Sequence, residues 1–377
     1  MEFTVSKSDL VRELGLSQGV VEKKTTIPIL SNVLIEAEGD RVTLTATDLE
    51  LGIRCSCPAR VSRAGAGTIP AKRLLDYVRL LPEADIQVRF AENQWANLVC
   101  GRSRTRIAGM SQESFPELPA MPDVLAEIPV SLLASMIVRT IFAISAEESR
   151  FTLNGAQLIL RPEGLAMVAT DGHRLALVEQ PAELGLEPGT NYRALLPRKA
   201  MQEIIKLSGE TAAGTTMRFA GDDNHLFFEF GERLLLSRKL TGNFPDYERV
   251  LPKDHPHTVR LPRQDLRSAV ERVAQFADER SRAVRIQMAE SEMKVLANLA
   301  EAGESEETLP LAWDGPGLEI GFNAQYILDF LRVVNEDSVE FRFRDPQSAG
   351  EMRPAAPEDG NGNGDAAYRY VIMPMRI

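Results

Sequence analysis

Cysteine is scarce in this sequence, which has three cysteines among 377 residues. Three is an odd number and too few for the disulfide framework of a secreted protein. We therefore interpret Cys55, Cys57 and Cys100 as structural thiols in a reducing compartment.

Long apolar runs are also missing, because no run approaches the roughly 18 residues of a membrane span. The first residues, MEFTVSKSDL, lack the basic, apolar and small-residue order of a secretion signal. We expect a cytoplasmic protein with no membrane partner. The length suits two or three domains, and a content of 44% hydrophobic and 26% charged residues is typical of a globular protein.

Motifs for cofactors and metals are absent as well. No G-x-x-x-x-G-K-[ST] loop occurs, and the glycine cluster at residues 360–364 follows no strand and precedes no helix. Cys55 and Cys57 lack a second Cys/His pair at ligand spacing, so we expect no metal and no cofactor. His255 and His257 flank a proline and are predicted to lie in a solvated linker.

Positive charge is in deficit, since 43 Lys and Arg face 54 Asp and Glu and the net charge is -11. Taken alone, this balance argues against a nucleic-acid partner. A net charge is only a sum, however, and it does not exclude a protein that is acidic on one face and basic on another.

What the sequence does contain is internal repetition. Residues 41–55 (RVTLTATDLELGIRC) alternate apolar with polar side chains, and the phase of the alternation changes at Asp48. Period two predicts half-buried strands, and the change of phase predicts a bend, a bulge or a short turn. Residues 165–178 repeat the Ala-Thr-Asp 123 residues later, and residues 292–303 form a weaker third copy with Asn298 in place of the aspartate.

A second pattern repeats in step with the first, namely a strand end followed by an amphipathic helix. It occurs at residues 68–81, 195–207 and 320–334. The predicted apolar stripes are Leu74, Leu75 and Val78, then Met201, Ile204 and Ile205, then Ile327, Phe330 and Leu331. Basic residues occupy equivalent positions 127 and 126 residues apart, at Arg79, Lys206 and Arg332.

A third pattern, a strand followed by a helix, opens each copy at residues 3–14, 128–138 and 259–270. We therefore predict three domains, at residues 1–124, 125–253 and 254–377. Each is predicted to be an α+β domain, with a largely antiparallel sheet and two helices on one side of it. The stretch from about 350 to 366 is rich in Gly, Asn and Pro and is predicted to be a flexible insertion in the last domain.

The middle copy of the bend reads Asp171-Gly172-His173-Arg174, and three interpretations compete. A catalytic Asp-His dyad in a hydrolase or deaminase would need a nucleophile or a substrate pocket as well. A purely structural turn explains why the aspartate recurs, but not the His-Arg pair. Because the other two copies lack that pair, we favour a local binding role for His173 and Arg174.

Over its whole length, the sequence resembles the bacterial DNA polymerase III beta subunit family, the replicative sliding clamps. The residues that carry the resemblance are MEFTV at the start, residues 27–39, ATDLEL at 46–51, FTLNG at 151–155, VATDGHRLA at 168–176, LPRKAM at 196–201, NFPDYERVLP at 243–252, IGFNAQYILDFL at 320–331 and YVIMPMRI at 370–377. The resemblance implies a head-to-tail homodimer of three DNA-clamp domains per chain, closed into a ring with helices lining the hole.

The resemblance also implies the function of a DNA polymerase processivity factor without catalytic activity. Such a clamp encircles double-stranded DNA without sequence preference, slides along it and is opened by a clamp loader. Contacts with phosphates must then be weak and blind to sequence. The residues implied to line the hole are Lys24, Lys72, Arg73, Arg79, Arg150, Arg198, Lys199, Lys206 and Arg332.

Partners of this family, which include the polymerase alpha subunit, the clamp loader and other proteins with clamp-binding motifs, bind as short peptides between domains 2 and 3. Apolar anchors with a few polar groups suit such a pocket. The matching residues are Leu153, Thr170, Gly172, His173, Arg174, Leu175, Pro245, Arg249, Val250, Asn323, Tyr326, Val371, Met373, Pro374, Met375 and Arg376. Ser281 and Gln347 depart from the apolar residues that the family often has.

For the contact between subunits, the candidates are Arg106, in the strand around 104–108, and Phe276. One alternative stays open beside the clamp, a repeat scaffold that binds proteins without DNA.

Overall fold

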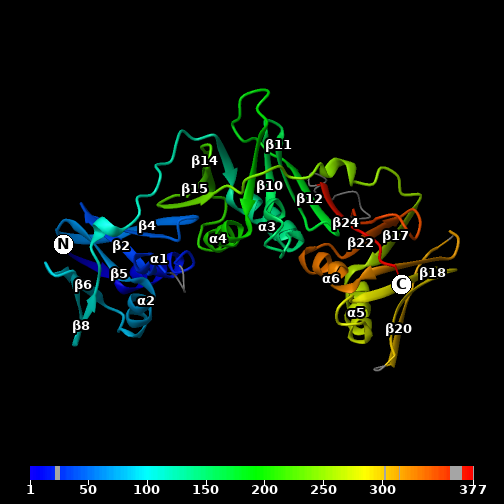
Figure 1. The fold of residues 1–377 in the computed structure, drawn as a ribbon, viewed down its shortest axis with the longest axis horizontal. Coiled ribbons are helices and arrows are strands. Elements are labelled where there is room, and N and C mark those ends of the chain that lie inside the picture. The colour runs from blue at the N-terminus through cyan, green and yellow to red at the C-terminus, as the bar shows by residue number, and fades with distance from the viewer. Residues whose placement is uncertain (22–25, 301–302, 314, 357–366, 377) are drawn as a thin grey trace. The chain divides into compact units, whose positions relative to one another are not determined.

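The computed structural model describes residues 1–21, 26–300, 303–313, 315–356 and 367–376, and Figure 1 shows its fold. Lys24 and most of the predicted insertion, residues 357–366, lie outside the described residues. The chain divides into two compact units. The N-terminal unit comprises residues 1–134 and 199–239, and the C-terminal unit comprises residues 135–198 and 240–377.

The N-terminal unit is built on one antiparallel sheet whose main path runs β8-β7-β6-β1-β4-β16-β15-β14-β9. Strands β2, β3 and β5 branch from it, with β3 paired to β4 and β2 paired to both β3 and β5. The bounds are β1 (Glu2–Ser6), β2 (Asn32–Glu38), β3 (Arg41–Thr47), β4 (Leu51–Arg63), β5 (Gly65–Pro70), β6 (Asp85–Phe90), β7 (Trp95–Cys100), β8 (Ser103–Ala108), β9 (Ala126–Pro129), β14 (Thr216–Gly221), β15 (His225–Phe230) and β16 (Arg233–Arg238).

Helices α1 (Lys7–Ser17) and α2 (Ala71–Leu80) lie side by side and pack on strands of this sheet (Figure 1). The predicted stripe of Leu74, Leu75 and Val78 is buried, whereas Lys72 and Arg79 are exposed on the other side of α2. Helix α4 (Arg198–Gly209) shows the same division, since Met201 and Ile204 are buried and Lys206 is exposed, but the predicted Ile205 is half-buried. The amphipathic pattern therefore predicted most of the buried face of these two helices correctly.

The C-terminal unit has two antiparallel sheets, with strand orders β13-β10-β11-β12-β24-β23-β22-β17 and β20-β19-β18-β21. Helices α5 (Arg263–Val273) and α6 (Ala324–Val333) pack together, and α5 contacts strands of both sheets. Helix α3 (Val130–Thr140) precedes β10. The strand bounds are β10 (Gly155–Arg161), β11 (Gly164–Thr170), β12 (Arg174–Pro181), β13 (Tyr192–Pro197), β17 (His257–Pro262), β18 (Ala283–Ala289), β19 (Glu292–Leu299), β20 (Gly303–Pro310), β21 (Leu318–Asn323), β22 (Ser338–Phe343), β23 (Gly350–Pro354) and β24 (Ala367–Ile372).

Consecutive sequence repeats are joined by shared sheets. Strand β4 of the first repeat pairs with β16 of the middle repeat, from Cys55 opposite Arg233 to Leu51 opposite Ser237. Strand β12 of the middle repeat pairs in the same way with β24 of the third repeat. The middle repeat thus contributes strands to both compact units.

The bend predicted at Asp48 and Asp171 is one turn formed twice. Asp48 Oδ1 accepts the main-chain N–H groups of residues 50 and 51, at 3.0 and 2.7 Å, and Asp171 Oδ1 accepts those of residues 173 and 174, at 2.9 and 3.0 Å. The residue after each aspartate is left-handed, Leu49 with φ 77° and Gly172 with φ 90°. The prediction fails for the third copy, because Asn298 lies within β19 and stays paired to β20.

Two predictions about the last repeat are wrong in part. Residues 350–354 are not flexible but form β23, which pairs with both β22 and β24. His255 is not solvated, because its side chain is 7% exposed with Nε2 3.6 Å from a carboxylate oxygen of the buried Glu351. Arg369 explains this burial, since its Nη2 donates to Pro252 O at 2.9 Å and holds the linker against β24. His257 is not in a linker, because it begins β17, and its ring lies 5.2 Å from that of Trp313.

Candidate functional site

The turn between β11 and β12 is held by its own side chains. Thr170 Oγ1 donates to Arg174 O at 2.7 Å and accepts the N–H of Gly172 at 3.1 Å. Asp171 accepts two main-chain N–H groups, and its Oδ2 accepts Arg174 Nε at 3.1 Å. Local hydrogen bonds therefore define the conformation of residues 170–174.

Arg174 carries this turn into contact with the third repeat. Its Nη1 donates to Asp329 Oδ2 at 2.6 Å, and its Nη2 donates to Phe142 O at 2.6 Å. The guanidinium carbon lies 4.3 Å from the centre of the Tyr326 ring, a cation–π distance. Burial by itself lowers the pKa of Arg174, but Tyr370, Asp329 and Asp171 together raise it, so the side chain is charged. Arg174, whose side chain is 10% exposed, therefore joins β12 to α6.

The geometry is wrong for a catalytic Asp-His dyad. Both carboxylate oxygens of Asp171 accept hydrogen bonds, from two main-chain N–H groups and from the Arg174 guanidinium. His173 contributes its main-chain N–H to Asp171, and its side chain is exposed. Among the described residues, no hydrogen bond links the imidazole to that carboxylate, so the hydrolase alternative loses its geometric basis.

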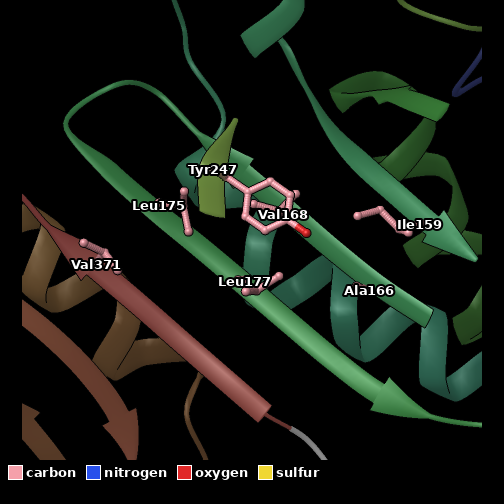
Figure 2. Close-up of a cluster of buried hydrophobic side chains, with 7 residues drawn as sticks. All are labelled: Ile159, Ala166, Val168, Leu175, Leu177, Tyr247 and Val371. Carbon is pink, nitrogen blue, oxygen red and sulfur yellow. The ribbon is translucent and has the colours of Figure 1, made fainter. Parts of the chain in front are cut away.

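Next to the turn, one face of the sheet carries an apolar cluster, shown in Figure 2. The ring of Tyr247, from the 3₁₀ turn Tyr247–Arg249, covers Val168 and lies beside Leu175 and Leu177. Leu175 is 2% exposed and Val371 is 1% exposed. These two predicted pocket residues are therefore core residues that form the floor of the site.

Around this floor, three large apolar side chains remain exposed, and we call them the rim: Phe151 at 70%, Val250 at 45% and Met373 at 43%. Met373 N donates to His173 O at 2.9 Å, which places it beside the turn. Arg150 Nη1 donates to Asp171 O at 2.9 Å, which ties the residue before Phe151 to the turn. The sequence reasoning missed Phe151, and the only available signal was a large aromatic residue beside Leu153.

The remaining predicted pocket residues are half-buried or exposed. Asn323 caps α6 by accepting Gln325 N at 2.9 Å, and it donates to Ser281 O at 3.3 Å. Met375 N donates to Gly321 O at 2.8 Å, so the C-terminal segment runs alongside β21. The half-buried members are Leu153, Asn323, Tyr326, Pro374 and Met375, and the exposed ones are Gly172, His173, Pro245, Arg249 and Arg376.

The residues predicted to line the hole fall into two groups, those on exposed helix faces and those that make internal hydrogen bonds. Lys72, Arg73, Arg79, Lys199 and Lys206 are exposed on α2 and α4. Several are paired with acidic neighbours, Lys72 with Asp76 and Lys199 with Asp48. Arg198 donates to Ile144 O at 2.6 Å and Arg150 donates to the turn, so these two guanidiniums already serve internal contacts. Arg332 is 45% exposed at the end of α6.

The two candidates for the subunit contact lie near sheet edges. Arg106 is exposed on the edge strand β8, with its guanidinium 5.0 Å from the centre of the Trp95 ring. Phe276 is half-buried in a 3₁₀ turn that contacts the edge strand β20.

Comparison with known proteins identifies the class that this fold and this non-catalytic site define, the replicative DNA clamps. Models of the N-terminal, central and C-terminal domains of the DNA polymerase III beta subunit match residues 1–119, 127–246 and 248–376. The chain is 37% identical to the beta sliding clamp of Caulobacter vibrioides and 35% identical to that of Pseudomonas putida, with full coverage of both chains in each case.

Solved structures agree with these sequence relatives. The DNA polymerase III subunit beta of Pseudomonas aeruginosa matches with a TM-score of 0.93 and 35% identity over 100% of both chains. The sliding clamp of Bacillus subtilis matches with a TM-score of 0.92 and 25% identity over 100% of this chain and 99% of that one. The chain belongs to the DNA polymerase III beta subunit family.

The predicted family, the fold class of three clamp domains, and the function of a non-catalytic processivity clamp are thereby confirmed. Among the described residues, no helix is long and apolar enough to cross a membrane.

Proposed function

We propose that two copies of this chain close head to tail into a ring around double-stranded DNA, in the cytoplasm at the nucleoid. The ring slides without reading sequence and tethers the polymerase alpha subunit, the clamp loader and other partners. Its domains are residues 1–124, 125–253 and 254–377. The observation that carries the proposal is the match of all three family domains, in order, along the whole chain.

Exposed basic residues on equivalent helices support the contact with DNA. Arg79, Lys206 and Arg332 recur at one position of α2, α4 and α6. All three are exposed, the Lys206 side chain by 54% and the Arg332 side chain by 45%. Cations on mobile side chains bind phosphates without holding one base sequence, which sliding requires. Ion pairs with neighbouring carboxylates weaken this attraction further, as with Lys206 and Glu203 at 2.5 Å.

The partner site in this proposal is the surface formed by the turn at 171–173 and the rim. Exposed apolar side chains from separate segments suit the anchors of a short peptide, and His173 and Arg376 supply polar contacts. Leu175 and Val371 contribute indirectly, because they pack in the same buried cluster as Tyr247 and support the loop that carries it. Phe151 joins the predicted set as a further anchor.

The subunit contact in this proposal pairs β8 of one chain with β20 of its partner. Both are edge strands, and such strands offer unpaired main-chain groups to another chain. The exposed charges are opposite, Arg104 and Arg106 on β8 and Glu304 and Glu306 on β20. Head-to-tail contacts of this kind close into a ring when the rotation per subunit allows it.

Reversing the charge of β8 tests this contact. The double substitution Arg104→Glu and Arg106→Glu should convert a dimer into chains of 41.7 kDa in sedimentation at low micromolar concentration, because like charges would face each other. Adding Glu304→Arg and Glu306→Arg should restore the dimer. Arg60→Glu, an exposed arginine on β4, is the matched control and should leave the dimer intact. A dimer that survives reversal on β8 alone contradicts this interface.

The encirclement of DNA is tested by topology. Loaded by its clamp loader and ATP, the protein should stay on nicked circular plasmid and leave the same plasmid after linearisation, because only free ends release a closed ring. Retention on the circle should change little between low and moderate salt, unlike ordinary phosphate binding. Equal retention on both forms would instead favour the alternatives, a scaffold or an ordinary DNA-binding protein.

A further inference from the structure

Helix α6 presents three functional side chains at spacings of three residues. Tyr326 stacks against the Arg174 guanidinium, Asp329 accepts from that guanidinium, and Arg332 lies one turn further along. Residues three apart are neighbours on a helix surface. One face of α6 therefore runs from the candidate partner site to a candidate DNA contact.

Asp329 lies between two arginines. Its Oδ2 accepts Arg174 Nη1 at 2.6 Å, whereas its Oδ1 faces Arg332 Nη1 at 3.5 Å and accepts Gln325 Nε2 at 2.6 Å. The two arginines differ in exposure, since Arg174 is 10% and Arg332 is 45% exposed. The pair with Arg332 is therefore the weaker and more strongly screened of the two.

Arg332 and Gln325 are also open to solvent on the side away from the turn. Both line a hollow of about 750 Å³ between α6, the end of α5 and the 3₁₀ turn that follows it. Arg282 lines the same hollow, and its Nη1 donates to Gln325 Oε1 at 3.3 Å. Three carboxylates line it as well, Glu271, Asp278 and Glu279, and Glu271 Oε1 lies 4.0 Å from Arg332 Nη2. A charged group that reaches Arg332 or Gln325 meets one of the two side chains that share Asp329 Oδ1.

We propose that Asp329 is a positioning residue of the partner site, and that it couples this site to an anion bound by Arg332. A phosphate that draws Arg332 away leaves Arg174 as the cation paired with this carboxylate, beside the hydrogen bond from Gln325. Asp329 then holds Arg174 more firmly, and Arg174 fixes the turn to α6 in the arrangement that receives a peptide. This proposal rests on the proposed function, because it concerns the same site and the same DNA contact.

The physical size of this coupling is limited by the exposure of Arg332. Partly exposed ion pairs contribute modestly, so the expected effect on peptide affinity is about two- to fivefold. Linkage requires the effect to be reciprocal, which means that a bound peptide strengthens the contact of Arg332 with DNA by the same factor.

The repeat structure supplies a matched control. Lys206 on α4 occupies the position equivalent to Arg332, and it pairs with Glu203 as Arg332 pairs with Asp329. Glu203 does not touch Arg174, because the described bonds of that guanidinium go to Asp171, Asp329, Tyr370 and Phe142. Removing Lys206 therefore removes an equivalent cation without changing the partners of Arg174.

The experiment measures the affinity of a fluorescent peptide with the clamp-binding sequence of the polymerase alpha subunit, by anisotropy, for dimeric protein. Asp329→Asn should weaken binding at least about fivefold, because a neutral amide replaces a charge-assisted acceptor. Arg332→Ala should tighten binding about two- to fivefold, since it frees Asp329 as a phosphate would. Lys206→Ala should leave the affinity unchanged.

The double variant Asp329→Asn with Arg332→Ala decides between coupling and a general structural effect. Coupling through Asp329 predicts that Arg332→Ala has no effect once Asp329 is asparagine. The same tightening in both backgrounds, or no tightening in either, overturns the proposal while leaving the partner site in place. Wild-type protein that fails to bind the peptide at all overturns the proposed function, and this inference with it.

Discussion

Replacing Arg174 with alanine should weaken peptide binding more than tenfold and destabilise the C-terminal unit by about 3 to 5 kcal/mol, the usual cost of breaking a buried ion pair. The substitution removes hydrogen bonds to Asp329, Asp171 and Phe142 O at once. It leaves Asp171, which is 15% exposed, without its cation, and Asp329, which is 16% exposed, with the longer ion pair to Arg332. Urea unfolding and peptide anisotropy measure the two effects.

The neighbouring residue provides the control for this experiment. His173→Ala should lower peptide affinity and change the unfolding free energy by less than about 0.5 kcal/mol, because its side chain is exposed. Arg174→Lys should recover part of the stability but not the stacking on Tyr326, since lysine lacks the planar fork. An Arg174→Ala protein as stable as wild type would show that these contacts do not hold the junction of β12 with α6.

Replacing Glu13 with glutamine should destabilise the N-terminal unit by about 3 to 5 kcal/mol. Glu13 on α1 is 1% exposed and accepts Arg233 at 2.7 and 2.9 Å and Arg12 at 2.8 Å. Glutamine keeps the shape but leaves the half-buried Arg233 guanidinium uncompensated. Arg12→Ala is the matched control, and because Arg12 is 44% exposed it should cost about 1 kcal/mol or less.

The same residue gives stability a dependence on acid. Burial by itself raises the pKa of Glu13, but Arg233 and Arg12 lower it below its usual value of 4.5. A carboxyl group with a lower pKa in the folded state stabilises the protein above the unfolded pKa, and this stability is lost as pH falls through the folded pKa. The free energy of unfolding, measured between pH 6 and pH 3, should therefore fall less steeply with falling pH for Glu13→Gln than for wild type. Equal slopes would show that Glu13 is not the group responsible.

Much of the fold could be predicted because the chain repeats local patterns. The turn at Asp48 and Asp171 needs only a Thr-Asp pair between alternating strands, and its hydrogen bonds are local. The apolar stripes of α2, α4 and α6 predicted the buried faces for the same reason. Patterns of period two and 3.6 residues carry this information within a few residues of each position.

The interpretation of Arg174 could not be completed from the sequence. Its charge partner Asp329 lies 155 residues away, and no periodicity marks the two as neighbours. The burial of Leu175 depends in the same way on Tyr247, which arrives from a later loop. His255 looked solvated because its own segment is polar, and only Arg369 and Glu351 explain why it is enclosed. Long-range contacts decided each of these cases.

The shared sheets also determine what a fragment of this chain would be. A piece cut between the first and middle repeats would separate β4 from β16, and a cut between the middle and third repeats would separate β12 from β24. Each cut would expose a strand edge that the intact chain covers, and such edges pair with other chains and aggregate. The sequence repeat is therefore not an independent unit of folding, and a soluble single-repeat fragment would need a redesigned edge.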